Sequence, residues 1–222
     1  RHLPAEKVHL IWNGAPLDEF APVAPERAQA LRTELGIPAG ALVVGVVGRL
    51  NEKTGHRYLV QAAPQVLAQV PMARFLIVGD GDLLGELRQL AAALGIADRV
   101  VFAGHRADVP AVLGALDVFC ISSVYEGTPL ALFEAMAARK AIVSTAVDGC
   151  REVLEDRGSG LLVSPRDPAA LAQALIEVLS KADLRESLAR SAQAASSRYD
   201  IRTCVTRMES LYDEVLAEKG LV

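Results

Sequence analysis

The chain has 222 residues, of which 51% are hydrophobic, and it carries a formal net charge of −4. A chain of this length and composition can bury one substantial core, so we expect one main domain with a short appendage. The acidic balance excludes the basic surface by which proteins bind nucleic acid or anionic lipid. Apolar runs are only strand-sized, whereas a transmembrane helix needs about 20 apolar residues, so we expect no membrane span.

The three cysteines, Cys120, Cys150 and Cys204, are odd in number and far apart in the sequence. Without a CxxC pair they indicate reduced, buried thiols in a cytoplasmic protein. The chain opens on Arg1 rather than Met, and no signal-peptide pattern follows. We therefore expect a piece of a longer protein, or a processed chain.

The first 40 residues are expected to form a connector rather than a domain. Residues 8–12 (VHLIW) are a short apolar piece that predicts an N-terminal strand, and the turn dipeptide Asn13-Gly14 follows it. A proline-rich segment then leads into an amphipathic run that stops at Gly36 and Pro38. The expected organisation is therefore an N-terminal strand and connector over residues 1–40, a main domain over 41–200, and a C-terminal helix over 201–222.

From Leu42 onwards, unbroken apolar strands alternate with segments of helical period. This alternation predicts a parallel sheet that right-handed crossovers cover on both faces. The expected fold class is α/β, a doubly wound, Rossmann-like parallel sheet of about six strands. The predicted strands are residues 42–47, 74–78, 100–102, 117–121, 141–144 and 160–163. The predicted helices are roughly residues 56–70, 83–94, 109–115, 129–138, 167–179, 184–198 and 201–218.

The stretch 122–139 is a turn that feeds a helix directly after a predicted strand. Thr128 is the expected N-cap of this helix, with Pro129 at its first position. A helix that begins at the carboxyl edge of the sheet directs free backbone N–H groups at whatever lies there. The stretch therefore predicts a site for an anion such as a phosphate.

Two carboxylates, Glu126 and Glu134, lie eight residues apart around this junction. On a single helix they would be separated by about 12 Å of rise, which is too far for the roughly 5–9 Å acid/base couple of a glycoside hydrolase. If Glu126 lies in the loop instead, the pair can flank an elongated ligand, and carboxylates suit the vicinal hydroxyls of a ribose or hexose. The alternative is that Glu134 has a structural role and Glu126 is solvated.

Residues 48–55 (GRLNEKTG) form a turn after the first strong strand, with an arginine and a lysine at the edge where phosphates bind. The guanidinium of Arg49 and the ammonium of Lys53 would together neutralise a diphosphate. The order of a Walker A loop is absent. The alternative is a solvated loop whose cations pair with local acids such as Glu52.

Other candidate residues give weaker signals. Residues 79–82 (GDGD) do not match GxGxxG, so we interpret them as a strand-ending turn in which Asp82 caps the next helix. His56 and His105 lack companions for a metal site. Arg106 follows the third strand and could stack on a base, although a solvated loop residue is the more common role.

Taken together, these segments resemble the C-terminal, nucleotide-sugar-binding domain of the family-4 (group 1) glycosyltransferases, which have the GT-B fold. The matching motifs cover nearly the whole chain in the family's order. They are Asn13-Gly14, VGRL at 47–50, FLIVGDG at 75–81, DVF at 117–119, EGTPLALFEAMA at 126–137, which is the E-x7-E motif, and GLLV at 160–163.

The resemblance implies roles for the residues around the E-x7-E motif. Glu134 would hold the ribose hydroxyls, and Glu126 would contact the transferred sugar. Backbone amides at the start of the following helix, around Gly127, Thr128 and Leu130, would hold the distal phosphate.

The resemblance also assigns the first turn. Arg49, after Gly48, would bind the diphosphate and stabilise the leaving group, while the base would lie near the loop that ends at Arg106. The family's phosphate lysine stands immediately before the glycine that opens the helix; here that position is Thr54, and Lys53 comes one residue earlier. Either Lys53 reaches the phosphate through a shifted loop or the contact is lost. The expected catalytic residues are Arg49, Lys53 and Glu126.

The implied reaction moves a sugar from a nucleoside-diphosphate sugar to an acceptor with retention, for example in polysaccharide biosynthesis. The resemblance implies no metal, because Arg49 and the helix N-terminus take over its charge-neutralising role. The family also has an N-terminal, acceptor-binding domain that nothing in this chain matches. We therefore expect the donor-binding half of an enzyme, inactive alone, whose partners are a nucleotide sugar and the missing half. Any peripheral membrane contact would come through that missing half.

Two alternatives remain open at this point. One is a non-catalytic nucleotide-sugar-binding module, which the threonine at position 54 favours. The other is a nucleotide-sugar 2-epimerase of the same fold. The E-x7-E spacing together with the GRL motif favours the transferase over the epimerase.

Overall fold

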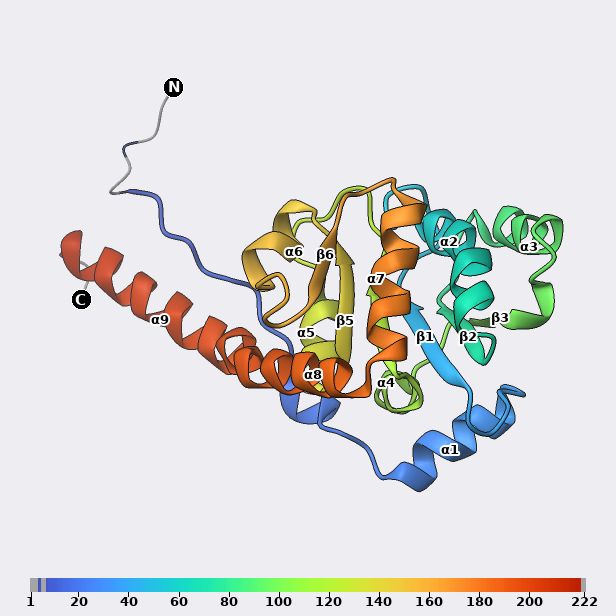
Figure 1. Ribbon diagram of the computed structural model, residues 1–222. Helices are drawn as coiled ribbons and strands as arrows, with labels where there is room; N and C mark the ends of the chain where they lie inside the picture. The colour runs from blue at the N-terminus through green and yellow to red at the C-terminus, as the bar shows by residue number, and fades with distance from the viewer. Residues whose placement is uncertain (1–3, 5–6, 221–222) are drawn as a thin grey trace.

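The computed structural model describes residue 4 and residues 7–220. Within these residues, six parallel strands form one sheet in the order β3-β2-β1-β4-β5-β6 (Figure 1). The strands are β1 (Leu42–Val47), β2 (Ala73–Val78), β3 (Val100–Gly104), β4 (Val118–Ile121), β5 (Ala141–Thr145) and β6 (Leu161–Val163). The predicted α/β fold with a doubly wound parallel sheet is confirmed.

Helices cover both faces of the sheet (Figure 1). The α-helices are α1 (Pro25–Glu34), α2 (His56–Gln69), α3 (Leu84–Ala93), α4 (Val109–Ala115), α5 (Leu130–Ala137), α6 (Asp148–Val153), α7 (Pro168–Ser180), α8 (Ala182–Ser196) and α9 (Ile201–Glu218). Short 3-10 turns are η2 (Leu17–Phe20), η3 (Ala97–Arg99) and η4 (Ser197–Tyr199). Helices α2, α3 and α7 contribute to the core on one face, and α4 and α5 to the core on the other.

Successive residues of each central strand enter opposite cores. In β1, Val43 belongs to the core with α4 and α5, while Val44 and Val46 belong to the core with α2 and α7. Both faces of the strand are therefore buried, which is why the strands are unbroken apolar runs rather than alternating ones.

The chain order of the strands reverses between β1 and β4. From β1 the chain adds β2 and β3 on one side, and it then returns to place β4 on the other side of β1. Open α/β sheets bind ligands at such a switch point, outside the carboxyl ends of the strands. The loops that leave β1 and β4 are therefore the structural candidates for a site.

The predicted N-terminal strand is wrong. Residues 8–12 have no regular secondary structure, and the first pairing in this region is an isolated bridge between Ala15 and Asp200. Val8 and Leu10 are 61% and 72% exposed, so this apolar piece lacks the neighbouring strand and the core that would make it a sheet element. Residues 1–3 and 5–6 of the predicted connector, and 221–222 of the predicted C-terminal helix, lie outside the described residues.

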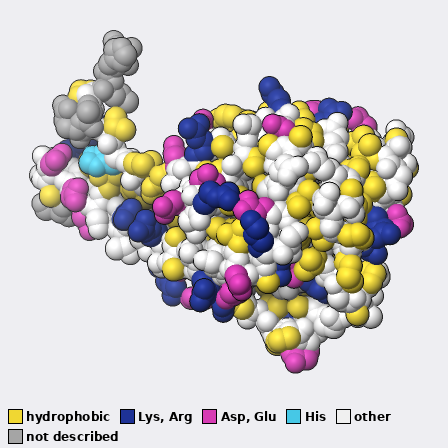
Figure 2. Space-filling view, in the orientation of Figure 1, with side chains coloured by type: hydrophobic (Ala, Val, Ile, Leu, Met, Phe, Trp, Pro, Cys, Tyr) yellow, Lys and Arg dark blue, Asp and Glu magenta, His cyan; other side chains and the backbone are white. Residues whose placement is uncertain are grey.

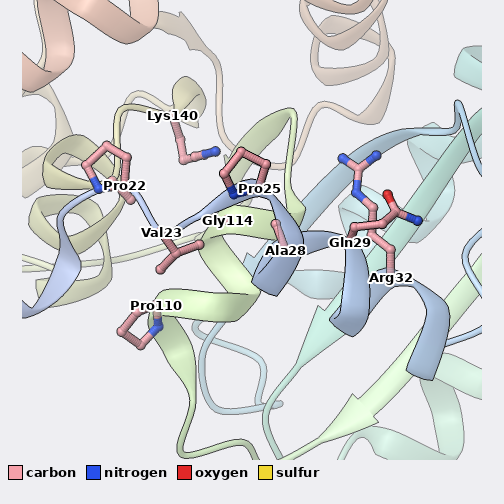
Figure 3. A pocket seen from close by; sticks show the side chains of 10 residues that line it. Pro22, Val23, Pro25, Ala28, Gln29, Arg32, Pro110, Gly114 and Lys140 are labelled. Atoms are coloured by element: carbon pink, nitrogen blue, oxygen red, sulfur yellow. The ribbon is translucent and has the colours of Figure 1, made fainter.

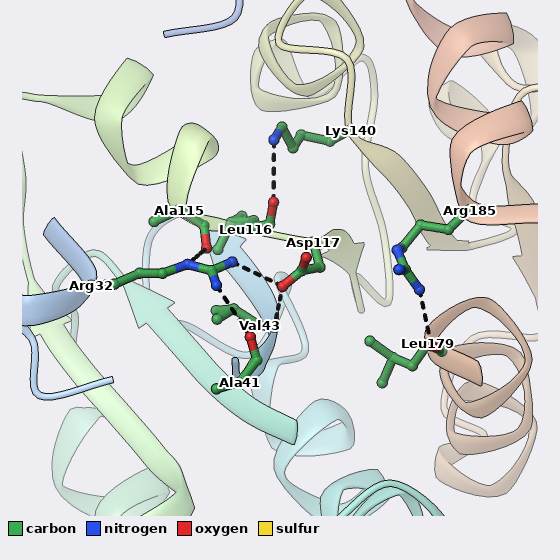
Figure 4. A network of polar contacts seen from close by, with 9 residues as sticks. All are labelled: Arg32, Ala41, Val43, Ala115, Leu116, Asp117, Lys140, Leu179 and Arg185. Carbon is green, nitrogen blue, oxygen red and sulfur yellow. Dashed lines mark hydrogen bonds and ion pairs between the residues drawn. The ribbon is translucent and has the colours of Figure 1, made fainter. Parts of the chain in front are cut away.

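Arg32 of α1 ties the connector to the sheet (Figure 4). Its guanidinium donates to the carbonyl oxygens of Ala115 (2.9 Å) and Ala41 (3.1 Å) and to Asp117 Oδ2 (2.9 Å). The same carboxylate oxygen accepts from the N–H of Val43 at 2.7 Å. This network holds the amino ends of β1 and β4, at the opposite edge of the sheet from the switch point.

A cavity of about 330 Å³ lies beside this network, between the segment with Pro22 and Pro25, helix α4 and Lys140 (Figure 3). Gly114 of α4 allows the close approach, because a Cβ there would come within 2.3 Å of Val23 Cγ2. The connector therefore lies directly on the domain.

Helix α9 confirms the predicted C-terminal helix but has no buried residue. It extends away from the body of the molecule (Figure 1), and its exposed apolar side chains are Ile201, Val205, Met208, Tyr212, Val215 and Leu216. No helix in the described part of the chain is both long enough and apolar enough to cross a membrane. Acidic and basic side chains are interspersed over the body in Figure 2.

Candidate functional site

Two cavities adjoin at the carboxyl edge of the sheet and share Val47, Gly48 and Arg49 in their walls. The first, of about 290 Å³, lies between the loops 48–55 and 122–129. The second, of about 590 Å³, extends along the loops after β2 and β3 as far as His105 and Arg106. Together they form a cleft over β1, β2, β3 and β4, with Arg49 at the junction.

The loop after β1 is held against the loop after β2 by backbone contacts. The N–H of Gly48 donates to Val78 O (3.0 Å), and that of Leu50 donates to Asp80 O (2.9 Å). A Cβ at Gly79, whose φ is +133°, would lie 2.0 Å from Gly48 O, and one at Gly81 would lie 2.3 Å from Leu50 O. The glycines of the GDGD stretch therefore serve loop packing. Both, with Asp80, also line the larger cavity.

The predicted cap at Asp82 is wrong. The N-cap of α3 is Leu83, and no side chain caps it. The N–H of Leu83 donates to Leu50 O at 3.2 Å, so the start of α3 is held by the loop after β1.

The loop after β1 is also joined to the loop after β4. Val124 N–H donates to Lys53 O at 2.8 Å, and Ser122 Oγ donates to Thr54 O at 3.2 Å. Gly55 has a φ of +62°, and a Cβ there would meet Ser122 O at 2.2 Å. Glycine is thus required where the turn enters α2.

The loop after β4 rests in turn on β5 and α6. Thr145 Oγ1 donates to Ser123 O at 2.7 Å. The loop and α6 approach so closely that a Cβ at Gly149 would lie 1.1 Å from Gly127 O. Helix α6 was missed from the sequence, because six residues offer no helical repeat. It nevertheless positions the loop that carries Glu126.

The predicted N-cap of α5 is also wrong. Pro129 itself is the N-cap, with extended backbone angles (φ −71°, ψ 119°), and no side chain caps the helix. Because the extended ψ of Pro129 delays the helix by one residue, Thr128 lies one position before the N-cap, where its side chain does not cap the helix. The N–H of Leu132 donates to Pro129 O at 3.0 Å, so the amides of Leu130 and Ala131 lie before the helical ladder, and both residues line the smaller cavity.

Lys53 and Glu126 face each other across the smaller cavity. Lys53 Nζ lies 3.1 Å from Glu126 Oε2, and Ser123 Oγ donates to Glu126 Oε1 at 3.4 Å. The Lys53 side chain is 49% exposed, whereas that of Glu126 is 15% exposed. The alternative, in which the cations of the loop 48–55 pair with Glu52, is wrong for Lys53, because Glu52 pairs instead with Arg57 of α2 (3.6 Å). Neither Lys53 nor Glu126 is simply solvated.

Arg49 and Glu134 have no side-chain partner within the described residues. No hydrogen bond or ion pair joins the Arg49 guanidinium or the Glu134 carboxylate to residue 4 or residues 7–220. Glu134 lies on α5 and is half-buried, and burial raises the pKa of its carboxyl group. Glu134, Thr128 and Gly127 do not line the two cavities. The predicted residues that do line them are Gly48, Arg49, Lys53, Arg106, Glu126 and Leu130.

Arg106 is not the solvated loop residue that its position suggested. Its guanidinium pairs with Asp108 at 2.8 Å and with Glu34 of α1 at 2.7 Å, and its side chain is 18% exposed. Hydrogen bonding to Arg106 lowers the pKa of Asp108. The paired acids hold Arg106 as a fixed wall of the larger cavity.

Of the three cysteines, Cys120 lines the smaller cavity, and Cys150 and Cys204 line neither cavity of the cleft. Cys120 and Cys150 are buried, and burial raises their pKa to about 12 and about 11, respectively. Cys204 is only half-buried, so the prediction of three buried thiols is wrong there. Among the described residues, no group of three or more His, Cys, Asp or Glu side chains is arranged to hold a metal ion.

Sequence reasoning missed His56 as part of the cleft. It opens α2, is 1% exposed and lines the smaller cavity. The available signal was its position directly after the turn 48–55.

A family model described as group 1 glycosyl transferases matches residues 41–181. A D-inositol 3-phosphate glycosyltransferase of Corynebacterium urealyticum is 32% identical over 215 residues, which cover 93% of this chain and 51% of the relative. A UDP-Gal:alpha-D-GlcNAc-diphosphoundecaprenol alpha-1,3-galactosyltransferase of Escherichia coli is 27% identical over 216 residues, or 96% of this chain and 56% of the relative. The chain thus spans about half the length of the curated relatives it matches.

The crystal structure of HepE from Anabaena in complex with UDP aligns with a TM-score of 0.88 at 29% identity, covering 95% of this chain and 58% of that chain. A structure of HepE with UDP-glucose aligns with the same TM-score and identity. These structures extend the likeness from the sequence to the fold.

Proposed function

This chain belongs to the group 1 glycosyltransferases, and we propose that residues 41–200 form the donor-binding half of a retaining enzyme that transfers a sugar from a nucleoside-diphosphate sugar to an acceptor. The observation that carries the proposal is the cleft at the switch point, where Arg49 stands between two cavities without a side-chain partner in the described chain. An unpaired guanidinium at this edge suits a diphosphate that spans the two cavities.

The diphosphate would lie between Arg49, Lys53 and the first amides of α5. Lys53 already contacts Glu126, so a phosphate oxygen would take a place beside an existing ion pair. The amides of Leu130 and Ala131 precede the helical ladder and would add backbone donors together with the positive end of the helix dipole. This set would also bear the negative charge that develops on the leaving group.

The two glutamates would act as hydroxyl acceptors. Glu126, at the end of the smaller cavity, would contact the transferred sugar. Glu134 is a half-buried carboxylate without a partner in the described residues, and burial raises its pKa. Ribose hydroxyls would satisfy it, because a carboxylate accepts hydrogen bonds from a vicinal diol.

The base would occupy the larger cavity beside His105 and the wall formed by Arg106. UDP is the first probe, since HepE was crystallised with UDP and with UDP-glucose. We also propose that donor binding needs no metal, because the cations and amides of the cleft supply the positive charge. Acceptor binding is assigned to a separate half, since the chain spans about half the length of its curated relatives.

Calorimetric titration of the chain with UDP, UDP-glucose, GDP, ADP and uridine tests this proposal. Arg49→Ala should weaken UDP about 10- to 100-fold, the usual loss of a charge-assisted hydrogen bond, and leave uridine almost unchanged. Glu134→Ala should weaken both UDP and uridine. Arg207→Ala, an exposed cation on α9, is the control.

Three results would contradict the assignment. They are the absence of binding by every nucleotide, equal weakening of UDP and uridine by Arg49→Ala, and unchanged uridine affinity in Glu134→Ala.

A further inference from the structure

The hydroxyl of Thr54 is the centre of the turn 48–55. Its Oγ1 lies 2.6 Å from Arg49 O, 3.0 Å from Asn51 O and 2.8 Å from His56 Nδ1. The N–H of Asn51 also points to it at 3.4 Å, and Asn51 Oδ1 accepts from the Thr54 N–H at 3.1 Å. One side chain thus connects the start of the turn, its middle and the first residue of α2.

The single hydroxyl proton fixes the tautomer of His56. A carbonyl oxygen cannot donate, so the 2.6 Å contact with Arg49 O requires Thr54 to donate there. Thr54 Oγ1 must then accept from His56, which places the ring proton on Nδ1. His56 Nε2 is left as a buried acceptor and has no partner within the described residues.

Burial keeps this ring neutral, since it lowers the pKa of His56 to about 4. A neutral, buried donor at Nδ1 is a rigid support for the threonine hydroxyl. A buried nitrogen without a hydrogen-bond partner, such as Nε2, lowers the stability of a folded protein, and folded proteins retain such groups at functional sites.

Lys53 directly precedes Thr54 and contacts the loop after β4. Its carbonyl accepts from Val124 N–H at 2.8 Å, and its ammonium lies 3.1 Å from Glu126 Oε2. The residue that follows it, Thr54, also accepts from Ser122 Oγ through its own carbonyl. The direction in which Lys53 leaves the backbone therefore depends on the conformation that the Thr54 hydroxyl maintains.

We propose that Thr54 is a positioning residue whose hydroxyl, supported by His56, sets the turn so that the Lys53 ammonium lies at the phosphate end of the cleft. The proposal rests on the proposed function for its ligand, but the geometry can be tested without one. Thr54 acts through Lys53 and needs no contact with the substrate.

The binding test is a double-mutant cycle between positions 54 and 53, read by calorimetry with UDP and with uridine. Thr54→Val keeps the shape but removes the hydroxyl, and should weaken UDP about tenfold with little change for uridine. Thr54→Ser should restore the affinity. In a Lys53→Met background, Thr54→Val should have no further effect. Thr33→Val, which removes an exposed hydroxyl of α1 bonded to Gln29 O, is the control.

The ligand-free test is amide hydrogen exchange at Val124, whose N–H donates to Lys53 O. Thr54→Val should accelerate this exchange about tenfold relative to the sheet amide of Leu76, while Thr54→Ser should not. The positioning role is refuted if Val124 exchange is unchanged, or if Thr54→Val weakens UDP equally with and without Lys53. If the wild-type chain binds neither UDP nor uridine, the proposed function fails, and Val124 exchange alone decides the positioning role.

Discussion

The buried ring of His56 predicts a loss of stability in mild acid. Its pKa is lowered from 6.5 to about 4 by burial, so between these values the unfolded chain binds a proton that the folded chain does not. Stability is therefore fully present above pH 6.5 and is lost as the pH falls towards 4. Protonation would also place an Nε2–H group where no acceptor lies among the described residues.

The magnitude follows from the two pKa values. At pH 5 the ring is largely protonated in the unfolded chain and largely neutral in the folded one, which costs about 2 kcal/mol of unfolding free energy relative to pH 7. For a chain of this size that corresponds to a fall of about 4–8 °C in Tm. Carboxylates titrate in the same range, so the difference between the wild type and a His56 variant is the informative quantity.

The assay is thermal or urea unfolding of wild type, His56→Asn and His56→Gln from pH 4.5 to 7.5. Each variant should be less stable than the wild type at pH 7, and the gap should shrink by about 2 kcal/mol at pH 5. His9→Asn changes an exposed ring and is the matched control. Curves for the wild type and both His56 variants that stay parallel from pH 7 to pH 5 would refute the reasoning.

Three further predictions concern the cleft. Burial raises the pKa of Glu134, so its ionised form lowers the stability of the folded chain once the pH exceeds the ordinary value of 4.5. Glu134→Gln should therefore raise Tm at pH 7, but not below pH 4.5, and should weaken the binding of UDP. Equal Tm of the wild type and the variant at pH 7 would contradict this. Gly149→Ala should destabilise the chain by about 1–3 kcal/mol in urea unfolding and weaken UDP, because its Cβ would lie 1.1 Å from Gly127 O. Gly85→Ala, a helix position with nothing within 4 Å, should instead be neutral or stabilising, and similar losses in both variants would argue against a loop contact. Excess EDTA should leave the calorimetric UDP affinity unchanged, whereas a loss that Mg²⁺ restores would show that a metal takes part.

The sheet was predictable because its strands are buried on both faces, and the resulting apolar runs can be seen in the sequence. The edge that carries the site followed from the same pattern, since the carboxyl ends of parallel strands meet there. Glu126 lies in a loop and Glu134 on α5, which is the arrangement that the hypothesis of two carboxylates flanking a ligand requires.

Features that depend on tertiary contacts, or on the exact backbone angles and hydrogen bonds of a turn, were not predictable. The strand expected at residues 8–12 needs a neighbour that the described fold does not supply. Arg106 pairs with Glu34, which is 72 residues away. The cap at Thr128 failed because the extended ψ of Pro129 delays the helix by one residue. Thr54 was noted only as a departure from the family pattern, since its hydrogen bonds to the turn and to His56 appear only in three dimensions.

The interlocked loops of the cleft limit how this scaffold can be re-engineered. At Gly55, Gly79 and Gly81 the backbone of one loop touches the next, and at Gly149 the backbone of α6 touches the loop after β4. None of these positions has room for a side chain. An insertion or a grafted loop at any of these points would displace the neighbouring backbone, so loop exchange is a poor route to a new ligand preference. Libraries should instead vary the side chains that face the cleft from its rim, such as His105 and Leu130, which can change size and polarity without disturbing the turns beneath them.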